Sequence, residues 1–104
     1  MKPRITARHF SLTDKLRDVV HEKYAKIEKY YDGITDARVI LTVERGRPKE
    51  KTAEIIITVF RQTLSSRDVG PSHEKALDNC VEGLRRQLLK YKGKLKDTTK
   101  DVHR

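Results

Sequence analysis

The sequence contains few of the residues that build covalent, metal-bound or membrane-spanning structure. Its 104 residues include one cysteine, three prolines and no tryptophan. A single thiol cannot form a disulfide within the chain, which is typical of a reducing compartment, so we expect a cytoplasmic protein. No apolar run approaches the roughly 20 residues of a membrane-spanning helix, and the first ten residues lack the apolar core of a signal peptide. The four histidines share no metal-ligand spacing with each other or with Cys80, so we expect neither a metal nor another cofactor.

Catalytic patterns are also missing. Ser65 and Ser66 lack the flanking glycines of a nucleophile elbow. The acidic pair Asp78 and Glu82 has helical spacing, which is typical of solvated charge on a helix face. We therefore predict that the protein is not an enzyme and has no small-molecule substrate.

Positive charge dominates the composition and gathers near the end of the chain. The formal net charge is +9, and residues 84–104 hold eight basic residues against two acidic ones. No aspartate or glutamate occurs from residue 83 to residue 96. A small domain with this charge distribution usually binds a polyanion.

Hydrophobic periodicity predicts six elements. Alternation of apolar and polar residues predicts strands, and apolar residues three and four apart predict helices. The expected elements are a strand in 3–10, a helix from a Ser11 N-cap to Gly33, strands at 36–44 and 52–60 around a basic loop, a weaker strand at 64–69, and a helix that starts after a Ser72 N-cap. We expect one domain in residues 1–96 and a disordered tail in residues 97–104.

The order of these elements predicts an α+β fold of β-α-β-β-β-α type. The first strand-helix-strand unit implies two parallel neighbours, and the later strands should run antiparallel. Two helices would cover one face of a four-stranded mixed sheet. The other face would expose polar residues, namely Thr6, Arg8, Arg38, Thr42, Glu54 and Thr58.

The stretch LRRQLLKYKGKLK, residues 84–96, combines an apolar stripe with cationic flanks. The stripe comprises Leu77, Val81, Leu84, Leu88, Tyr91 and Leu95. Arg86, Lys90 and Lys94 fall on one flank, and Arg85 and Lys92 fall on the other. Like charges four residues apart destabilise a helix by a few tenths of a kcal/mol each, which favours a functional role over a merely solvated face.

This pattern favours recognition of the RNA backbone and helix shape over reading of bases. Tyr30, Tyr31 and Phe60 could stack on bases, but they do not form an aromatic RNA-binding signature on a strand. A general double-stranded-RNA-binding protein remains an alternative. A module that uses the basic helix on a membrane surface or a partner protein is another, and the core's need for the apolar stripe disfavours it.

Residues 4 to about 96 resemble the ribosome hibernation-promoting factor and ribosome-associated inhibitor (protein Y) family. The resemblance lies in ITARHFSLTDKLRDVV, KIEKYYDGITDARVILTVE and ALDNCVEGLRRQLLKYKGKLK. It implies a fold similar to a double-stranded-RNA-binding domain, and binding to ribosomal RNA in the decoding region of the small ribosomal subunit. It also implies silencing or stabilisation of idle ribosomes in stressed or stationary cells.

The family's basic helices correspond to positions on both predicted helices of this chain. The candidate RNA-binding residues are Arg8, Lys23, Lys26, Lys29, Arg85, Arg86, Lys90, Lys92 and Lys94. The chain resembles the short members of the family, which lack a second, dimerisation domain. We therefore expect a monomer away from the ribosome.

Overall fold

The computed structural model describes residues 2–44 and 46–102, with the backbone alone at residue 48 and at residues 95–102. Its elements follow the predicted order: β1 (Arg4–Arg8), α1 (Asp14–Tyr30), β2 (Asp36–Glu44), β3 (Arg47–Val59), β4 (Gln62–Gly70) and α2 (His73–Val102). The predicted weak strand near residue 64 is a full nine-residue strand, β4.

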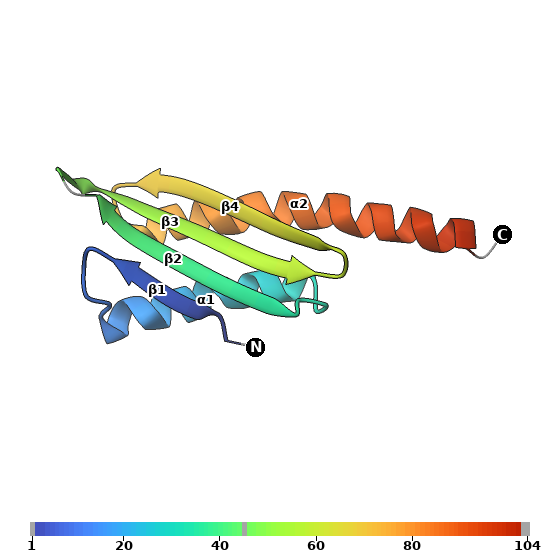
Figure 1. Cartoon of the computed structure of the whole chain (residues 1–104), viewed down its shortest axis with the longest axis horizontal. Coiled ribbons are helices and arrows are strands. Elements are labelled where there is room, and N and C mark those ends of the chain that lie inside the picture. The colour runs from blue at the N-terminus through green and yellow to red at the C-terminus, as the bar shows by residue number, and fades with distance from the viewer. Residues whose placement is uncertain (1, 45, 103–104) are drawn as a thin grey trace.

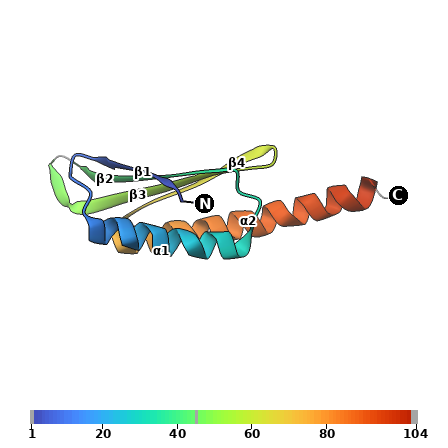
Figure 2. The same cartoon turned by 90° about the horizontal axis from the view of Figure 1, so that it is seen from below.

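The strands form one mixed sheet in the order β1-β2-β3-β4. β1 pairs with β2 in parallel, and β3 pairs with β2 and β4 in antiparallel register. Both helices lie on the same face of the sheet, and the last turns of α2 project past its edge (Figures 1 and 2). The predicted α+β fold is therefore confirmed.

The core fills the space between the sheet and the two helices. Alternate residues of β2 and β3 supply one side of it, and Val20, Tyr24 and Ile27 supply the α1 side. The α2 residues of the predicted stripe are buried from Leu77 to Tyr91, whereas the side chain of Leu95 lies outside the described ones. The Cys80 thiol donates to the carbonyl oxygen of Ala53 at 3.3 Å, and burial raises its pKa to about 12, as expected of a structural thiol.

The start of α1 differs from the prediction. Thr13, and not Ser11, is the N-cap, because its Oγ1 accepts a hydrogen bond from the backbone N–H of Leu16 at 3.1 Å. β1 ends early, at Arg8, because His9 adopts a left-handed backbone with φ 69°. The sequence offers several residues suited to capping in this segment, and local pattern alone could not choose between them.

The end of α1 also departs from the prediction of a left-handed Gly33. The helix ends at Tyr30, and Tyr31 leaves it with an extended backbone, φ −162°. A Cβ at position 33 would overlap the ring of Tyr31. Glycine at this position therefore allows a close approach to an aromatic ring.

The hairpin between β2 and β3 is tighter than predicted. The predicted basic loop at residues 45–51 is mostly strand, because β3 begins at Arg47. Gly46 has φ 83°, and the register shifts between Val43 and Glu44. Residue 45 lies outside the described residues.

α2 begins where the sequence indicated and runs further. The Ser72 hydroxyl accepts from the backbone N–H of Lys75 at 3.1 Å, which confirms the predicted N-cap. The helix is assigned to Val102, and the predicted disordered tail of residues 97–104, of which residues 103 and 104 lie outside the described residues, stays a prediction.

Gly83 explains how α2 packs against β4. A Cβ at this position would press on the Oγ and Cβ of Ser66. Glycine within a helix costs about 1 kcal/mol relative to alanine. Here it permits a close approach of the helix to the strand.

His73 links the first turn of α2 to the sheet. Its Nε2 lies 3.1 Å from the carbonyl oxygen of Thr42, and because a carbonyl can only accept, Nε2 carries the proton. The ring stacks on Phe10 with centroids 4.9 Å apart. Burial, and to a lesser extent the charge of Lys51, hold the pKa of His73 below its ordinary value.

We expect acid to destabilise the domain partly through His73. Its pKa is lower in the folded chain than in the unfolded one, so its contribution is complete above about pH 6.5 and is lost as the pH falls towards the folded value. Urea unfolding at pH 7.5 and pH 5.5 should show a smaller loss of unfolding free energy in His73→Gln than in the parent. An equal loss in both proteins would contradict this assignment.

Candidate nucleic-acid interface

The basic residues of α2 lie on both sides of its buried stripe. Arg86, Lys90, Lys92 and Lys94 are exposed, and Arg85 is partly exposed. Because the stripe faces the sheet and α1, these side chains divide between a side near α1 and a side near β4. Arg85 and Lys92 line one hollow and Arg86 lines another, in agreement with the flanks predicted for these three residues.

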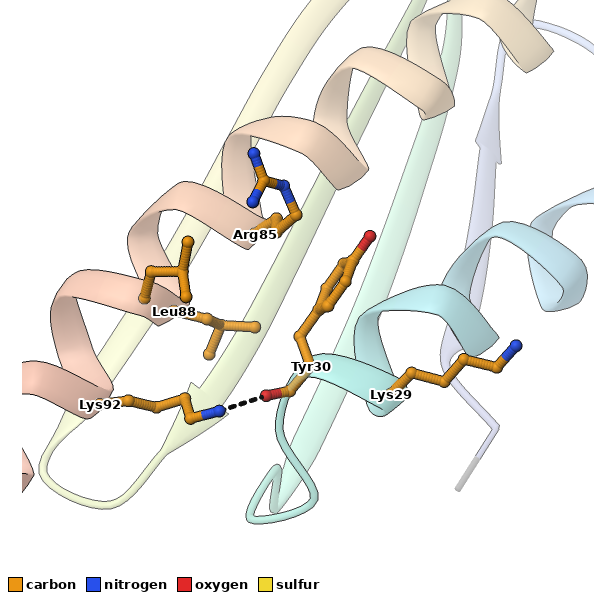
Figure 3. A pocket seen from close by; sticks show the side chains of 6 residues that line it. Lys29, Tyr30, Arg85, Leu88 and Lys92 are labelled. Atoms are coloured by element: carbon orange, nitrogen blue, oxygen red, sulfur yellow. Dashed lines mark hydrogen bonds between the residues drawn. The ribbon is translucent and has the colours of Figure 1, made fainter.

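The flank near α1 borders an open hollow of about 210 Å³ (Figure 3). Its lining residues are Lys29, Tyr30, Arg85, Leu88, Leu89 and Lys92. The Lys92 ammonium donates to the carbonyl oxygen of Tyr30 at 3.1 Å, which satisfies an acceptor at the end of α1. In this view the ammonium of Lys29 points away from α2. Among its lining residues, Lys29, Arg85 and Lys92 are cations and none is a carboxylate.

Arg85 shares its charge with an acid one turn earlier. Its Nε donates to both Glu82 carboxylate oxygens at 3.1 Å, and its Nη2 donates to Oε1 at 2.6 Å. This hydrogen-bonded pairing holds the pKa of Glu82 below its ordinary value. A phosphate would have to compete with Glu82 for Arg85, which makes Arg85 a weaker candidate than its exposed neighbours.

Lys23 is placed differently from the prediction. Its side chain is only 9% exposed and lies between the helices, with Nζ 2.8 Å from Asp78 and 3.6 Å from Glu74. The hydrogen bond to Asp78 raises the pKa of Lys23. Because its ammonium is already paired with two carboxylates, Lys23 is poorly placed for a direct RNA contact.

The remaining predicted residues fall on two different faces. Lys26 and Lys29 are exposed on α1, and Lys29 lines the same hollow as Lys92. Arg8 is exposed on β1, where alternation directs Ile5 towards the core and Arg8 to the opposite face of the sheet. The structure therefore brings Lys29 of α1 close to Arg85 and Lys92 of α2 and leaves Arg8 apart.

The flank near β4 contains a residue that the sequence did not single out. Arg67 of β4 and Arg86 line one hollow, together with Asp68, Asn79 and Glu82. Arg67 lies in a strand with little net charge, so only the packing of α2 on β4 shows its proximity to Arg86. The mixed signs make this side less cationic than the side near α1.

Leu89 was also missed. It lies off the apolar stripe, is 56% exposed and lines the hollow near α1. The sequence does contain a sign of this exposure, because Leu89 directly follows Leu88 and falls outside the helical spacing of the apolar stripe.

Comparisons with known proteins agree with this fold. The N-terminal domain of Thermus thermophilus Protein Y has a TM-score of 0.77 and 26% identity, over 88% of this chain and 99% of that chain. A ribosomal subunit interface protein from Coxiella burnetii has a TM-score of 0.75 at 19% identity, over 89% of this chain and 99% of that one, which supports the fold alone.

Sequence comparison decides the family. A family model described as Sigma 54 modulation protein / S30EA ribosomal protein matches residues 4–96. The chain belongs to this family. Ribosome hibernation promoting factors of Escherichia coli (strain K12) and Azotobacter vinelandii are each 33% identical to this S30EA-family chain, over 92% and 90% of it and 98% and 85% of their own lengths.

These S30EA-family relatives are named as factors, and neither name denotes an enzyme. Among the described residues, no group of three histidine, cysteine or acidic side chains could hold a metal ion. Within the same part of the chain, no helix is long and apolar enough to cross a membrane.

Proposed function

We propose that this chain is a ribosome hibernation factor that binds ribosomal RNA in the decoding region of the small ribosomal subunit. There it would silence or stabilise idle ribosomes in stressed or stationary cells, as a cytoplasmic protein that is monomeric off the ribosome. Its relatives are named for ribosome hibernation. The observation that carries the proposal is the set of exposed bases on both flanks of α2, together with a hollow beside α1 that Lys29, Arg85 and Lys92 line without a carboxylate.

The geometry of these bases suits a phosphate backbone. The predicted contact residues that are exposed on the helices are Lys26, Lys29, Arg86, Lys90, Lys92 and Lys94. Phosphate contacts of this kind set the position of a protein on RNA without reading its sequence. The two helices pack on a common sheet, so the backbone that carries these bases is fixed before binding, which reduces the entropy lost on association.

Co-sedimentation with purified ribosomal subunits on sucrose gradients tests the proposal. We expect the protein to migrate with the small subunit, and an excess of initiator tRNA and mRNA to displace it. Equal binding to any RNA duplex would instead favour the general double-stranded-RNA-binding alternative. Absence from both subunit fractions at low salt would overturn ribosome binding altogether.

We also expect the affinity for the small subunit to fall steeply with salt. Each phosphate neutralised should contribute roughly −0.7 to −0.9 to the slope of log affinity against log salt concentration. Use of three to six of the exposed cations therefore predicts a slope between roughly −2 and −5. The measurement is a binding titration from 50 to 300 mM KCl at constant Mg²⁺, and a flat dependence would contradict a phosphate-based contact.

A further inference from the structure

The turn that joins β3 to β4 exposes an aromatic ring. Val59 pairs with Gln62, so the turn consists of Phe60 and Arg61. Phe60 is 60% exposed, although large apolar side chains are normally buried. Its neighbours in β3, Ile57 and Val59, lie in the core, so the exposed ring is not needed to complete that core.

A tyrosine of α2 holds this turn in place. The Tyr91 hydroxyl of α2 donates to the carbonyl oxygen of Phe60 at 2.7 Å. The Tyr91 ring in turn makes an edge contact with Tyr31, which follows α1, with centroids 5.5 Å apart at an interplanar angle of 80°. The exposed ring therefore projects from a backbone that is attached to α2.

Arg61 occupies a backbone conformation that arginine seldom adopts. Its φ is 66°, in the left-handed region where glycine and asparagine are normal in such turns. Its guanidinium carbon lies 5.1 Å from the centroid of the Phe60 ring, within cation–π range. Backbone strain retained at an exposed position is common at functional sites.

The turn lies beside the basic part of α2. Tyr91, which binds the turn, has Lys90 and Lys92 as its chain neighbours, and both are exposed. α2 continues past this end of the sheet in both views (Figures 1 and 2). A partner at this place must suit a flat apolar ring and several cations at once. An unpaired nucleotide offers both a π-face and a phosphate.

We propose that Phe60 stacks on an unpaired base of the RNA and that Arg61 contacts an adjacent phosphate. This inference rests on the proposed function and extends it from backbone contacts to the capture of one base. It also gives a role to Phe60, an aromatic residue that does not pack in the core.

Substitutions in the turn test the stacking with small ribosomal subunits as the probe. Phe60→Ala and Phe60→Leu should each weaken binding roughly 5- to 100-fold, the range for loss of one base–aromatic stack. Arg61→Asn should weaken binding while leaving the melting temperature unchanged or higher, because asparagine tolerates the left-handed conformation. Binding by Phe60→Leu that equals the parent's would overturn the proposal, because leucine keeps the apolar character and removes only the ring.

A fluorescent ring provides the second test, because the chain contains no tryptophan. Phe60→Trp should bind small subunits with strong quenching of its emission, as expected of an indole stacked on a base. Val69→Trp is the matched control, since Val69 is 48% exposed and lies near the other end of β4. It should bind with unchanged emission.

The outcomes separate this inference from the proposed function. Binding of Phe60→Trp with emission like that of Val69→Trp would overturn the stacking and leave the proposed function intact. A blue shift without quenching would indicate an apolar contact with a ribosomal protein and would also overturn it. Failure of the parent protein to bind the subunit would overturn both.

Discussion

Reversing the charges of Arg86 and Lys90 is expected to reduce small-subunit binding by roughly 100-fold or more while the domain stays folded. Each side chain that contacts a phosphate is worth about 1.5 kcal/mol or more, so loss of two gives about two decades, and repulsion adds to this. Both side chains are exposed, so the core is untouched. Arg86→Glu places a carboxylate near Asp68 and Glu82, so a small fall in melting temperature is expected. Circular dichroism melting and subunit co-sedimentation measure the two effects.

The matched control is Lys15→Glu with Lys49→Glu, which changes the net charge by the same amount. Lys15 lies in the first turn of α1 and Lys49 in the β2–β3 hairpin, both exposed and away from the end of α2. Binding should stay within a few-fold of the parent's. If the control and the Arg86/Lys90 variant lose equal affinity, net charge and not a defined surface governs binding.

Leu84→Asp is expected to unfold the domain. Leu84 is fully buried at the centre of the α2 stripe. A carboxylate there would lose its hydration without gaining a partner, at a cost of several kcal/mol, which is comparable with the stability of a small domain. Loss of the helical circular dichroism signal at 25 °C is the measurement.

Leu89→Asp is the control on the same helix. Leu89 is 56% exposed, so a carboxylate at this position remains hydrated and the fold should persist. The same substitution places a negative charge in the hollow with Lys29 and Lys92, so subunit binding should weaken. Normal stability in Leu84→Asp would contradict the position assigned to the stripe.

The sequence predicted the elements well because burial leaves a periodic trace along the chain. Ala37, Val39 and Leu41 alternate in β2, and all three face the core. The α2 stripe gave the correct buried side from Leu77 to Tyr91 for the same reason. The N-cap of α1 was harder to predict, because the side chains of Ser11 and Thr13 both suit this position. The path of the backbone after β1 decides which of them caps the helix.

The site was less predictable because it depends on how separate elements meet. The position of Lys23 in the sequence of α1 suggests an exposed lysine. Its side chain is buried because Asp78 lies opposite it on α2. The proximity of Arg67 to Arg86 and the attachment of Phe60 to Tyr91 also arise only when β4 and α2 pack together. No pattern within one element carries such information.

The contact between Gly83 and Ser66 links two positions that are 17 residues apart in the chain. A larger residue at 83 would require a smaller one at 66, or a wider gap between α2 and β4. The two positions should therefore covary among descendants of this sequence. Their combined volume limits how closely α2 can approach β4 at this point, so the pair would influence where the helix stands on the sheet although neither residue carries a charge.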